Sequence, residues 1–233
     1  MSDQVLITGA SRGIGRAAAE RFRKEGWRVI NVSRSPCTVL GVVNVPVDLA
    51  VPGWEPAVEA ALRDGAGQGR LSVIHNAALY EHDDALTMDA DHLRRVLEVN
   101  VVAPLVLNRL ARPLLTDGSS LLYVSSTLGE KAVKGVASYV TTKHALIGMM
   151  RATCQDLAGT QVHTACVCPG FTDTEMLREH MGTDPAVRAS VAGMTTFGRL
   201  ITPEEIAGVL YLCATTPVLN GAVIHANLGQ IER

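Results

Sequence analysis

A tyrosine and a lysine in one predicted helix could together perform acid–base chemistry. Tyr139 and Lys143 stand four residues apart, so in a helix their side chains lie one turn apart on the same face. A free phenol has a pKa of about 10 and is a poor base at neutral pH, and a neighbouring ammonium favours the phenolate and lowers that pKa. The pair is a weak signal by itself, because a buried tyrosine with a satisfied hydroxyl and a solvated surface lysine are both common.

A serine at the end of a predicted strand could take part in the same chemistry. Ser126 stands 13 residues before Tyr139. Its hydroxyl could hydrogen-bond a substrate oxygen and stabilise negative charge that develops on that oxygen. It could equally cap the end of the strand, so these residues count as a site only when they are considered together.

The first predicted strand, Gln4–Thr8, runs directly into a glycine-rich turn, and a helix is predicted over Gly13–Lys24. Glycines permit a tight turn and let the backbone approach a pyrophosphate, which the N–H groups and partial positive charge of a helix N-terminus then bind. The strand–turn–helix context favours a dinucleotide site over an ordinary turn. The residues predicted to contact the cofactor here are Gly9, Ser11, Arg12, Gly13, Ile14 and Gly15.

The end of the second predicted strand indicates which dinucleotide is bound. An NAD site usually places an acid there, about 20 residues beyond the glycines, to hold the ribose 2′-hydroxyl. This chain has Ser33 and Arg34 instead, and a guanidinium can pair with a 2′-phosphate through two parallel N–H bonds. Arg12 could reach the same phosphate. We therefore expect NADP(H), with NAD(H) as the less favoured alternative.

Short apolar runs alternate with longer stretches of helical period along the chain. The predicted strands are Gln4–Thr8, Arg28–Val32, Val42–Val47, Leu71–His75, Ser119–Ser125, Gln161–Val167 and Ala222–Ala226. The predicted helices are Gly13–Lys24, Trp54–Arg63, Asp89–Leu115, Val136–Leu157 and Pro203–Ala214. Continuous apolar runs are typical of parallel strands covered by helices. The pattern predicts an α/β fold of the Rossmann type: a doubly wound, seven-stranded parallel sheet with helices on both faces, in a single domain over residues 1–233. The nine residues Ser33–Gly41 are too few for the usual crossover helix, so a loop or a single turn is expected there.

The composition limits the classes of function. Of 233 residues, 47% are hydrophobic and 19% charged, so the chain can form a core. The net charge of −2 argues against a nucleic-acid partner. The sequence has no apolar run close to the ~20 residues of a membrane span and opens with no signal-peptide pattern, so we expect a soluble, cytoplasmic protein without a membrane partner. Its five cysteines form no CxxC pair and are predicted to be buried thiols, with no metal site.

Taken in order, these motifs resemble the short-chain dehydrogenase/reductase family in its short, single-domain form. The glycine turn has the T-G-x-x-x-G-I-G spacing of that family, and Asn100, Ser126, Tyr139 and Lys143 match its catalytic tetrad. The resemblance implies hydride transfer between a nicotinamide cofactor and a carbonyl or secondary alcohol, with Tyr139 as the acid/base. It also implies that Asn100 holds a water that links Lys143 to solvent as a proton relay.

The resemblance implies further cofactor contacts. Asp48 matches the family's aspartate near the adenine. His75-Asn76-Ala77-Ala78 stands where the family usually carries N-N-A-G, and Pro169 opens its P-G-x-x-x-T motif, whose threonine touches the nicotinamide amide. The contacts so implied are Asp48, Leu49, Asn76, Ala77, Ala78, Pro169, Gly170, Thr172 and Thr174, together with Tyr139 and Lys143. Ala78 replaces the family's glycine and adds a methyl group near the path of the cofactor.

The substrate is left open by the sequence. Residues 175–197 correspond to a segment that covers the substrate as a mobile lid in relatives, and Tyr80 could form a wall of the site. In the family, helices such as Asp89–Leu115 and Val136–Leu157 pair between subunits, so a homodimer or homotetramer is expected. The alternative is a non-catalytic NADP-binding regulatory protein on the same fold. A nucleotide-sugar epimerase or dehydratase is disfavoured, because few residues follow Pro169 to build a substrate domain.

Overall fold

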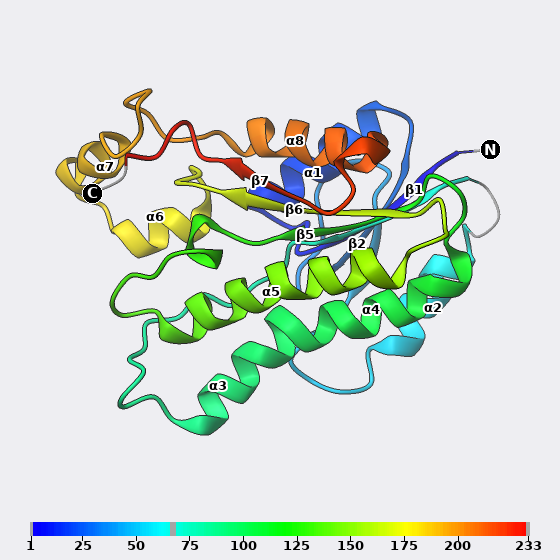
Figure 1. Ribbon diagram of the computed structural model, residues 1–233, viewed down its shortest axis with the longest axis horizontal. Helices are drawn as coiled ribbons and strands as arrows, with labels where there is room; N and C mark the ends of the chain where they lie inside the picture. The colour runs from blue at the N-terminus through cyan, green and yellow to red at the C-terminus, as the bar shows by residue number, and fades with distance from the viewer. Residues whose placement is uncertain (1, 66–68, 232–233) are drawn as a thin grey trace.

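Over residues 2–65 and 69–231, which this computed structural model describes, seven parallel strands form one sheet (Figure 1). They are β1 (Gln4–Thr8), β2 (Arg28–Ser33), β3 (Val43–Pro46), β4 (Leu71–His75), β5 (Ser120–Val124), β6 (His163–Pro169) and β7 (Ala222–Ala226). The order across the sheet is β3-β2-β1-β4-β5-β6-β7, and each neighbouring pair is parallel. The predicted α/β fold is therefore confirmed.

The burial of the strands explains why their sequences are continuous apolar runs. Every residue of β1, β4, β5 and β6 is buried, as expected for inner strands covered on both faces. The edge strand β3 is half exposed. Strand β6 begins two residues later than predicted, because the pairing with β5 starts at His163 opposite Ser120, and it then extends to Pro169.

Helices cover both faces of the sheet (Figure 1). They are α1 (Gly13–Lys24), α2 (Glu55–Arg63), α3 (Ala90–Leu97), α4 (Ala103–Ala111), α5 (Ala137–Asp156), α6 (Glu175–Met181), α7 (Pro185–Ala192) and α8 (Pro203–Thr215). Helices α1 and α8 lie together on one face, where the ring of Phe22 meets those of Trp27 and Tyr211 edge-on at centroid distances of 5.0 and 5.2 Å. Helices α2, α4 and α5 cover the other face through residues such as Leu62 and Met150.

The predicted long helix Asp89–Leu115 is not one continuous α-helix. It consists of α3, a π-helical turn over Glu98–Val102, α4 and a final 3₁₀ turn over Arg112–Leu114. Hydrophobic periodicity does not reveal a single widened turn, and such turns are frequent at functional sites. Asn100 lies inside the π turn, so this irregularity sits at a predicted tetrad position.

The connection between β2 and β3 is a loop, as its length predicted; the structure describes all of it and places no helix there. A side chain rather than a helix stabilises it. The Asn44 carboxamide accepts a hydrogen bond from the Cys37 N–H (2.7 Å) and from the Asn31 amide (2.9 Å). The short connection leaves the Arg34 side chain exposed directly after β2.

Helices α6 and α7 project beyond the carboxyl ends of the strands, at the left of Figure 1. Thr174 begins α6 by accepting a hydrogen bond from the Leu177 N–H (3.3 Å), and Asp184 begins α7 by accepting one from the Ala186 N–H (2.8 Å). Side-chain oxygens at these positions satisfy N–H groups that a helix start leaves unpaired. The segment after Thr174 is thus locally ordered by its own caps.

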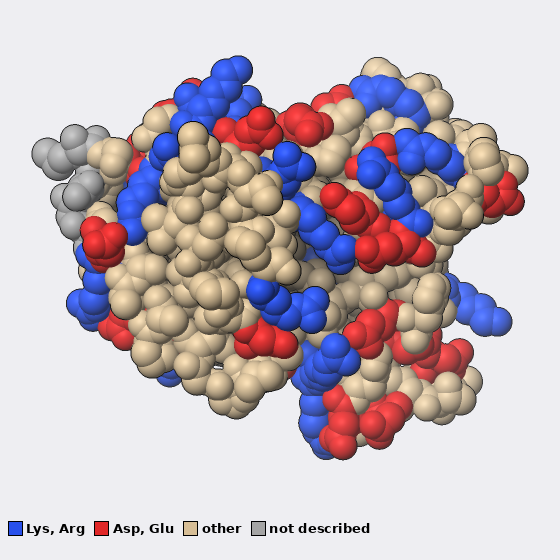
Figure 2. All heavy atoms as spheres, turned by 180° about the vertical axis from the view of Figure 1, so that it is seen from behind, with Lys and Arg blue, Asp and Glu red and all other residues tan. Residues whose placement is uncertain are grey.

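Surface charge follows the near balance of acids and bases. Figure 2 shows Lys and Arg interspersed with Asp and Glu over the face that it draws, beside a broad uncharged area. Within residues 2–65 and 69–231, every helix is too short or too polar to cross a bilayer.

Candidate active site

A cavity of about 1080 Å³ lies at the carboxyl ends of the strands, formed by the turns after β1, β2, β4, β5 and β6 and by α6. Parallel strands bring all these turns to the same edge of the sheet. The sequence-predicted residues that line it are Gly9, Ser11, Arg12, Gly13, Ile14, Ser33, Arg34, Asp48, Leu49, Asn76, Ala77, Ala78, Ser126, Tyr139, Lys143, Pro169, Gly170, Thr172 and Thr174. Gly15 and Asn100 are buried behind its wall.

The glycine turn has no room for side chains at its critical positions among the described residues. Gly9 has a φ of 71°, a conformation that L side chains rarely adopt. A Cβ on Gly15 would lie 2.2 Å from the Gly9 carbonyl oxygen and 2.6 Å from the Asn76 amide nitrogen. That amide donates to the carbonyls of Thr8 (2.9 Å) and Gly9 (3.2 Å), which fixes the turn against the end of β4.

The N-terminus of α1 opens onto the cavity directly after this turn. Arg12, the residue before the helix, has extended backbone geometry and directs its guanidinium to Glu179 of α6 (2.7 Å). The first N–H groups of a helix carry partial positive charge and lack partners within the helix. A close-approach turn, a helix N-terminus and an elongated cavity together fit the pyrophosphate of a dinucleotide.

The two arginines proposed for a 2′-phosphate have different surroundings. Arg34 is exposed at the cavity rim and forms no ion pair with an acid in the described part of the chain. Arg12 is paired with Glu179. Asp48, near them, accepts a hydrogen bond from the Ala50 N–H (2.9 Å), so its carboxylate also orders its own turn.

Tyr139 and Lys143 lie at the opposite end of the cavity from Arg34, on the first turns of α5. The Lys143 ammonium donates to the Val124 carbonyl (2.8 Å) and lies 5.2 Å from the centre of the Tyr139 ring. Burial lowers the pKa of Lys143 to about 8 and raises the pKa of the Tyr139 phenol, while interaction with Ser126 opposes the second change. The structure therefore brings these three predicted residues together, and it places Ser126 just past β5.

The Asn100 side chain does not line the cavity but contacts the helix that carries Tyr139 and Lys143. Its carboxamide accepts a hydrogen bond from the Leu79 N–H (2.7 Å) and donates to the Leu79 carbonyl (3.0 Å) and to the Thr142 hydroxyl (3.0 Å). Thr142 stands next to Lys143 in α5. The Asn100 side chain thus joins the π turn to the loop after β4 and to the helix that carries the tyrosine.

An aromatic wall faces Tyr139 from the loop after β4. The Tyr80 ring meets the Tyr139 ring edge-on at a centroid distance of 4.7 Å, and its hydroxyl lies 3.2 Å from His180 Nε2 of α6. His180 stacks on His82 at 4.7 Å. The sequence indicated Tyr80, but the two histidines carry no local motif, because they meet only when the loop and α6 are brought together.

Comparison with known proteins agrees with this geometry. A family model described as enoyl-(acyl carrier protein) reductase matches residues 9–230. The chain is 30% identical to an uncharacterized oxidoreductase of Methylorubrum extorquens, over 96% of each chain. It is similar to the aldohexose dehydrogenase of Thermoplasma acidophilum (27% identity, TM-score 0.88, 98% and 94% of the two chains) and to the angucycline C-6 ketoreductase LanV with bound NADP (26% identity, TM-score 0.84, 97% and 95%). The chain therefore belongs to the short-chain dehydrogenase/reductase family of oxidoreductases.

Proposed function

We propose that the protein is an NADP(H)-dependent oxidoreductase that interconverts a carbonyl and a secondary alcohol. The observation that carries the proposal is that one cavity is lined both by a glycine turn with a helix N-terminus, after β1, and by Ser126, Tyr139 and Lys143, after β5 and on α5. The glycine turn fits a pyrophosphate, and the three side chains can hold a carbonyl oxygen and move a proton.

The bound nicotinamide would supply or accept the hydride. Ser126 then hydrogen-bonds the substrate oxygen, and Tyr139 donates its phenolic proton to that oxygen during reduction. Burial raises the pKa of Tyr139, which keeps the phenol protonated and ready to act as an acid. The Lys143 ammonium, 5.2 Å from the ring, stabilises the phenolate that remains.

Asn100 supports this group through Thr142 and the π turn. In the proposed scheme it also holds the water that connects Lys143 to solvent, so that the proton on Tyr139 is replaced.

Arg34 supports the choice of NADP(H) over NAD(H). It stands at the cavity rim beyond β2, where an acid would repel a 2′-phosphate. LanV, a similar structure, holds NADP. Arg12 would join Arg34 when it leaves Glu179. The remaining proposed cofactor contacts are those that line the cavity, namely Ser33, Asp48, Leu49, Asn76, Ala77, Ala78, Pro169, Gly170, Thr172 and Thr174.

Residues 175–197, which include α6 and α7, form the proposed substrate lid of this single-domain chain. Met176, Leu177, His180 and Met194 from this segment line the cavity opposite Tyr80. The lid is tied to the glycine turn by the Arg12–Glu179 ion pair and to the loop after β4 by the contact of Tyr80 with His180. Closure of such a segment excludes water from the reaction.

The chain is also proposed to be a homodimer or homotetramer that pairs through α4 and α5. These helices form an outer face of the molecule in Figure 1. Leu105 of α4 is 58% exposed there, and a Cβ on Gly148 of α5 would meet open space. An exposed leucine and an open glycine on neighbouring helices leave room for the close approach of a second copy.

The test is turnover of a panel of ketones, sugars and 3-oxoacyl thioesters, followed by NADPH absorbance, with Tyr139→Phe as the comparison. We expect the wild-type enzyme to oxidise NADPH with at least one class, and the variant to lose about 10²–10⁴-fold in kcat with NADPH binding unchanged. Tight NADPH binding without turnover of any carbonyl would contradict the proposal and favour the non-catalytic regulator.

A further inference from the structure

The helix that carries Tyr139 lacks a cap from its own sequence. Helix α5 begins at Ala137, and the preceding residue, Val136, has a hydrocarbon side chain that cannot accept a hydrogen bond. Residues 137–140, all within the described part of the chain, include no acid. The first N–H groups of a helix have no partner inside it, so the turn that holds Tyr139 needs an acceptor from elsewhere.

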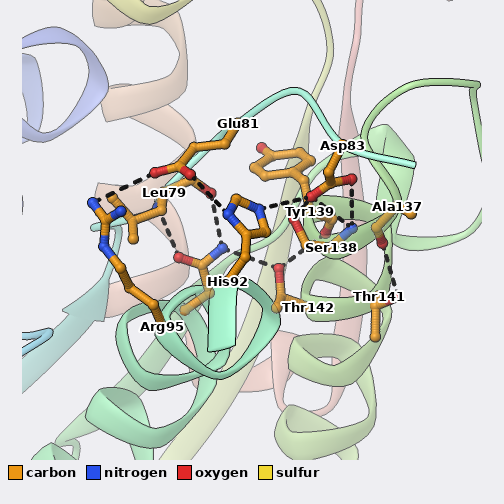
Figure 3. A network of polar contacts seen from close by, with 11 residues as sticks. Leu79, Glu81, Asp83, His92, Arg95, Ala137, Ser138, Tyr139, Thr141 and Thr142 are labelled. Carbon is orange, nitrogen blue, oxygen red and sulfur yellow. Dashed lines mark hydrogen bonds and ion pairs between the residues drawn. The ribbon is translucent and has the colours of Figure 1, made fainter. Parts of the chain in front are cut away.

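Asp83, in the loop after β4, supplies that acceptor (Figure 3). Its Oδ1 accepts a hydrogen bond from the Ser138 N–H (3.1 Å), and its Oδ2 accepts one from the Ser138 hydroxyl. The Asp83 N–H also donates to the Gly135 carbonyl (3.0 Å), just before the helix. A carboxylate at a helix N-terminus is further favoured by the helix dipole.

The Asp83 carboxylate is itself held in place. Its side chain is 5% exposed, and His92 Nε2 of α3 lies 3.1 Å from its Oδ2. The other ring nitrogen of His92 lies 3.3 Å from Glu81, whose second oxygen is 3.5 Å from Arg95. Burial opposes ionisation, but hydrogen bonds from Ser138 and His92 hold the pKa of Asp83 below its ordinary value. The carboxylate therefore stays an acceptor.

The loop after β4 also holds the residues that follow Ser138 in α5. Leu79 binds the Asn100 carboxamide, which donates to the Thr142 hydroxyl, and that hydroxyl donates to the Tyr139 carbonyl (2.9 Å). Tyr139 thus lies between two attachments, Asp83 at Ser138 and Asn100 at Thr142, both anchored in residues 79–83 (Figure 3).

We propose that Asp83 is a positioning residue: its carboxylate caps α5 from the loop after β4 and thereby fixes the Tyr139 phenol relative to Ser126 and Lys143. The inference rests on the proposed function of Tyr139. Asp83 does not line the cavity, so it acts through the backbone and hydroxyl of Ser138. A displacement of about 1 Å in a reacting group can cost about 100-fold in rate.

The test compares Asp83→Ala with Asp83→Asn and with a matched control, Asp84→Ala. The Asp84 carboxylate accepts from the Leu86 N–H (2.9 Å) within its own turn, so its removal leaves α5 untouched. Amide hydrogen exchange over residues 137–143 reports the cap without any substrate. Steady-state kinetics then separate kcat from the KM for NADPH.

Asp83→Ala is expected to speed exchange over residues 137–143 and to lower kcat by about 10- to 100-fold, with the KM for NADPH unchanged. Asp83→Asn keeps an oxygen that can accept from the Ser138 N–H, and asparagine caps helices about as well as aspartate, so its kcat should stay within about threefold of wild type. Asp84→Ala should behave as wild type.

The proposal is overturned if Asp83→Ala exchanges and turns over like Asp84→Ala, or if exchange rises while kcat does not change. It is also overturned if Asp83→Asn is as impaired as Asp83→Ala. A wild-type protein that turns over no carbonyl would contradict the proposed function instead, and the exchange comparison would still decide whether Asp83 caps α5.

Discussion

Burial acts in opposite directions on the two ionisable groups at the end of the cavity. It raises the pKa of the Tyr139 phenol and lowers the pKa of Lys143 to about 8. A neutral phenol suits proton donation during reduction, whereas alcohol oxidation needs the phenolate. The Lys143 ammonium lies 5.2 Å from the centre of the Tyr139 ring, so its positive charge favours the buried phenolate. The lysine is therefore expected to matter most in the oxidative direction.

Lys143→Met should move the pH dependence of alcohol oxidation to higher pH. The methionine keeps the length of the side chain and removes the ammonium, so the phenolate of Tyr139 loses its stabilising charge. The ascending limb of kcat against pH in the oxidative direction should shift upward by about 1–3 pH units. An unshifted limb, measured with NADP⁺ and an alcohol substrate, would contradict the role of Lys143.

Arg34→Ala should weaken NADPH binding selectively. Hydrogen bonds to a charged group contribute about 1.5–3 kcal/mol, so the dissociation constant for NADPH should rise about 10- to 100-fold and that for NADH should hardly change. The measurement is titration of both cofactors by calorimetry. Arg16→Ala, an exposed change on α1 outside the cavity, is the matched control. An unchanged NADPH/NADH ratio in Arg34→Ala would rule out the phosphate contact.

At the scale of elements, a side chain stabilises the π turn in addition to its backbone hydrogen bond from the Ala103 N–H to the Glu98 carbonyl. Asn100 pairs with both the N–H and the carbonyl of Leu79, and it is 1% exposed. Asn100→Ala would remove the hydrogen-bond partner of the Leu79 N–H and carbonyl, and the Thr142 hydroxyl would lose the hydrogen bond that it accepts. Because an unsatisfied buried polar group costs about 1–3 kcal/mol, we expect the free energy of unfolding to fall by about 2 kcal/mol or more in urea titrations.

The control for this change is Glu20→Ala, an exposed position on α1, where surface substitutions usually stay within about 0.5 kcal/mol. Equal stability of the two variants would mean that the π turn does not depend on the Asn100 carboxamide.

The predictability of the fold differs between its elements for physical reasons. Strands β1, β4 and β7 and helix α1 match their predicted bounds, and α8 begins at its predicted residue, Pro203, where Thr202 caps it, because local chemistry determines these positions. The π turn was missed, because a single widened turn leaves no mark on the hydrophobic periodicity, and the contacts of Asn100 with Leu79 join residues 21 positions apart. Helices α6 and α7 were not predicted separately, because residues 175–197 were expected only to form one lid segment.

The site residues likewise divide into those with a local sequence pattern and those that only the fold brings together. The glycine turn, Ser126, Tyr139 and Lys143 have fixed local spacing and were identified from the sequence, and the structure gathers them at one cavity. Asp83 and His92 were not identified, because a carboxylate that caps a helix 55 residues later leaves no pattern in either segment. The pairing of Arg12 with Glu179 depends on how α6 folds back over the glycine turn, which the sequence did not indicate.

Helix α6 of the proposed lid should loosen when the solution is acidified. Burial, and then the neighbouring His82, lower the pKa of His180, so the closed arrangement favours the neutral imidazole. The group's folded-state pKa is depressed below its ordinary value of about 6.5, so closure is favoured above that pH and is lost as the pH falls below it. The ion pair between Arg12 and Glu179 also holds α6, and it does not involve the two histidines.

Amide exchange over residues 175–181, corrected for the intrinsic effect of pH, should therefore be faster at about pH 5.5 than at about pH 8. His180→Gln keeps a polar side chain without the titration and should abolish this difference. If the variant retains the full pH effect, the stacked His82–His180 pair is not its source.

At the scale of the whole molecule, the parallel topology explains why distant segments make one site. All seven strands of the described chain end at the same edge, so the turn after β1, the serine after β5 and the motif after β6 meet there although they lie far apart in the sequence. Helices α4 and α5 occupy the outside of one face. The cavity lies at the edge of the sheet, whereas the proposed interface lies on this face, so a substitution on the exposed side of α4 can test the second copy without changing a residue of the cavity.

Leu105→Glu should convert the proposed oligomer into monomers. The Leu105 side chain is 58% exposed on α4, and Leu105→Glu both removes its apolar contact with the second copy and requires a charged group to be taken out of water, which is unfavourable. Leu40→Glu, at a side chain that is 93% exposed in the loop between β2 and β3, introduces the same charge away from α4 and α5. Light scattering after size-exclusion chromatography should give an oligomeric mass for the wild type and for Leu40→Glu, and the monomer mass for Leu105→Glu. A monomeric wild type, or an oligomer that survives Leu105→Glu unchanged, would show that this face does not carry the assembly.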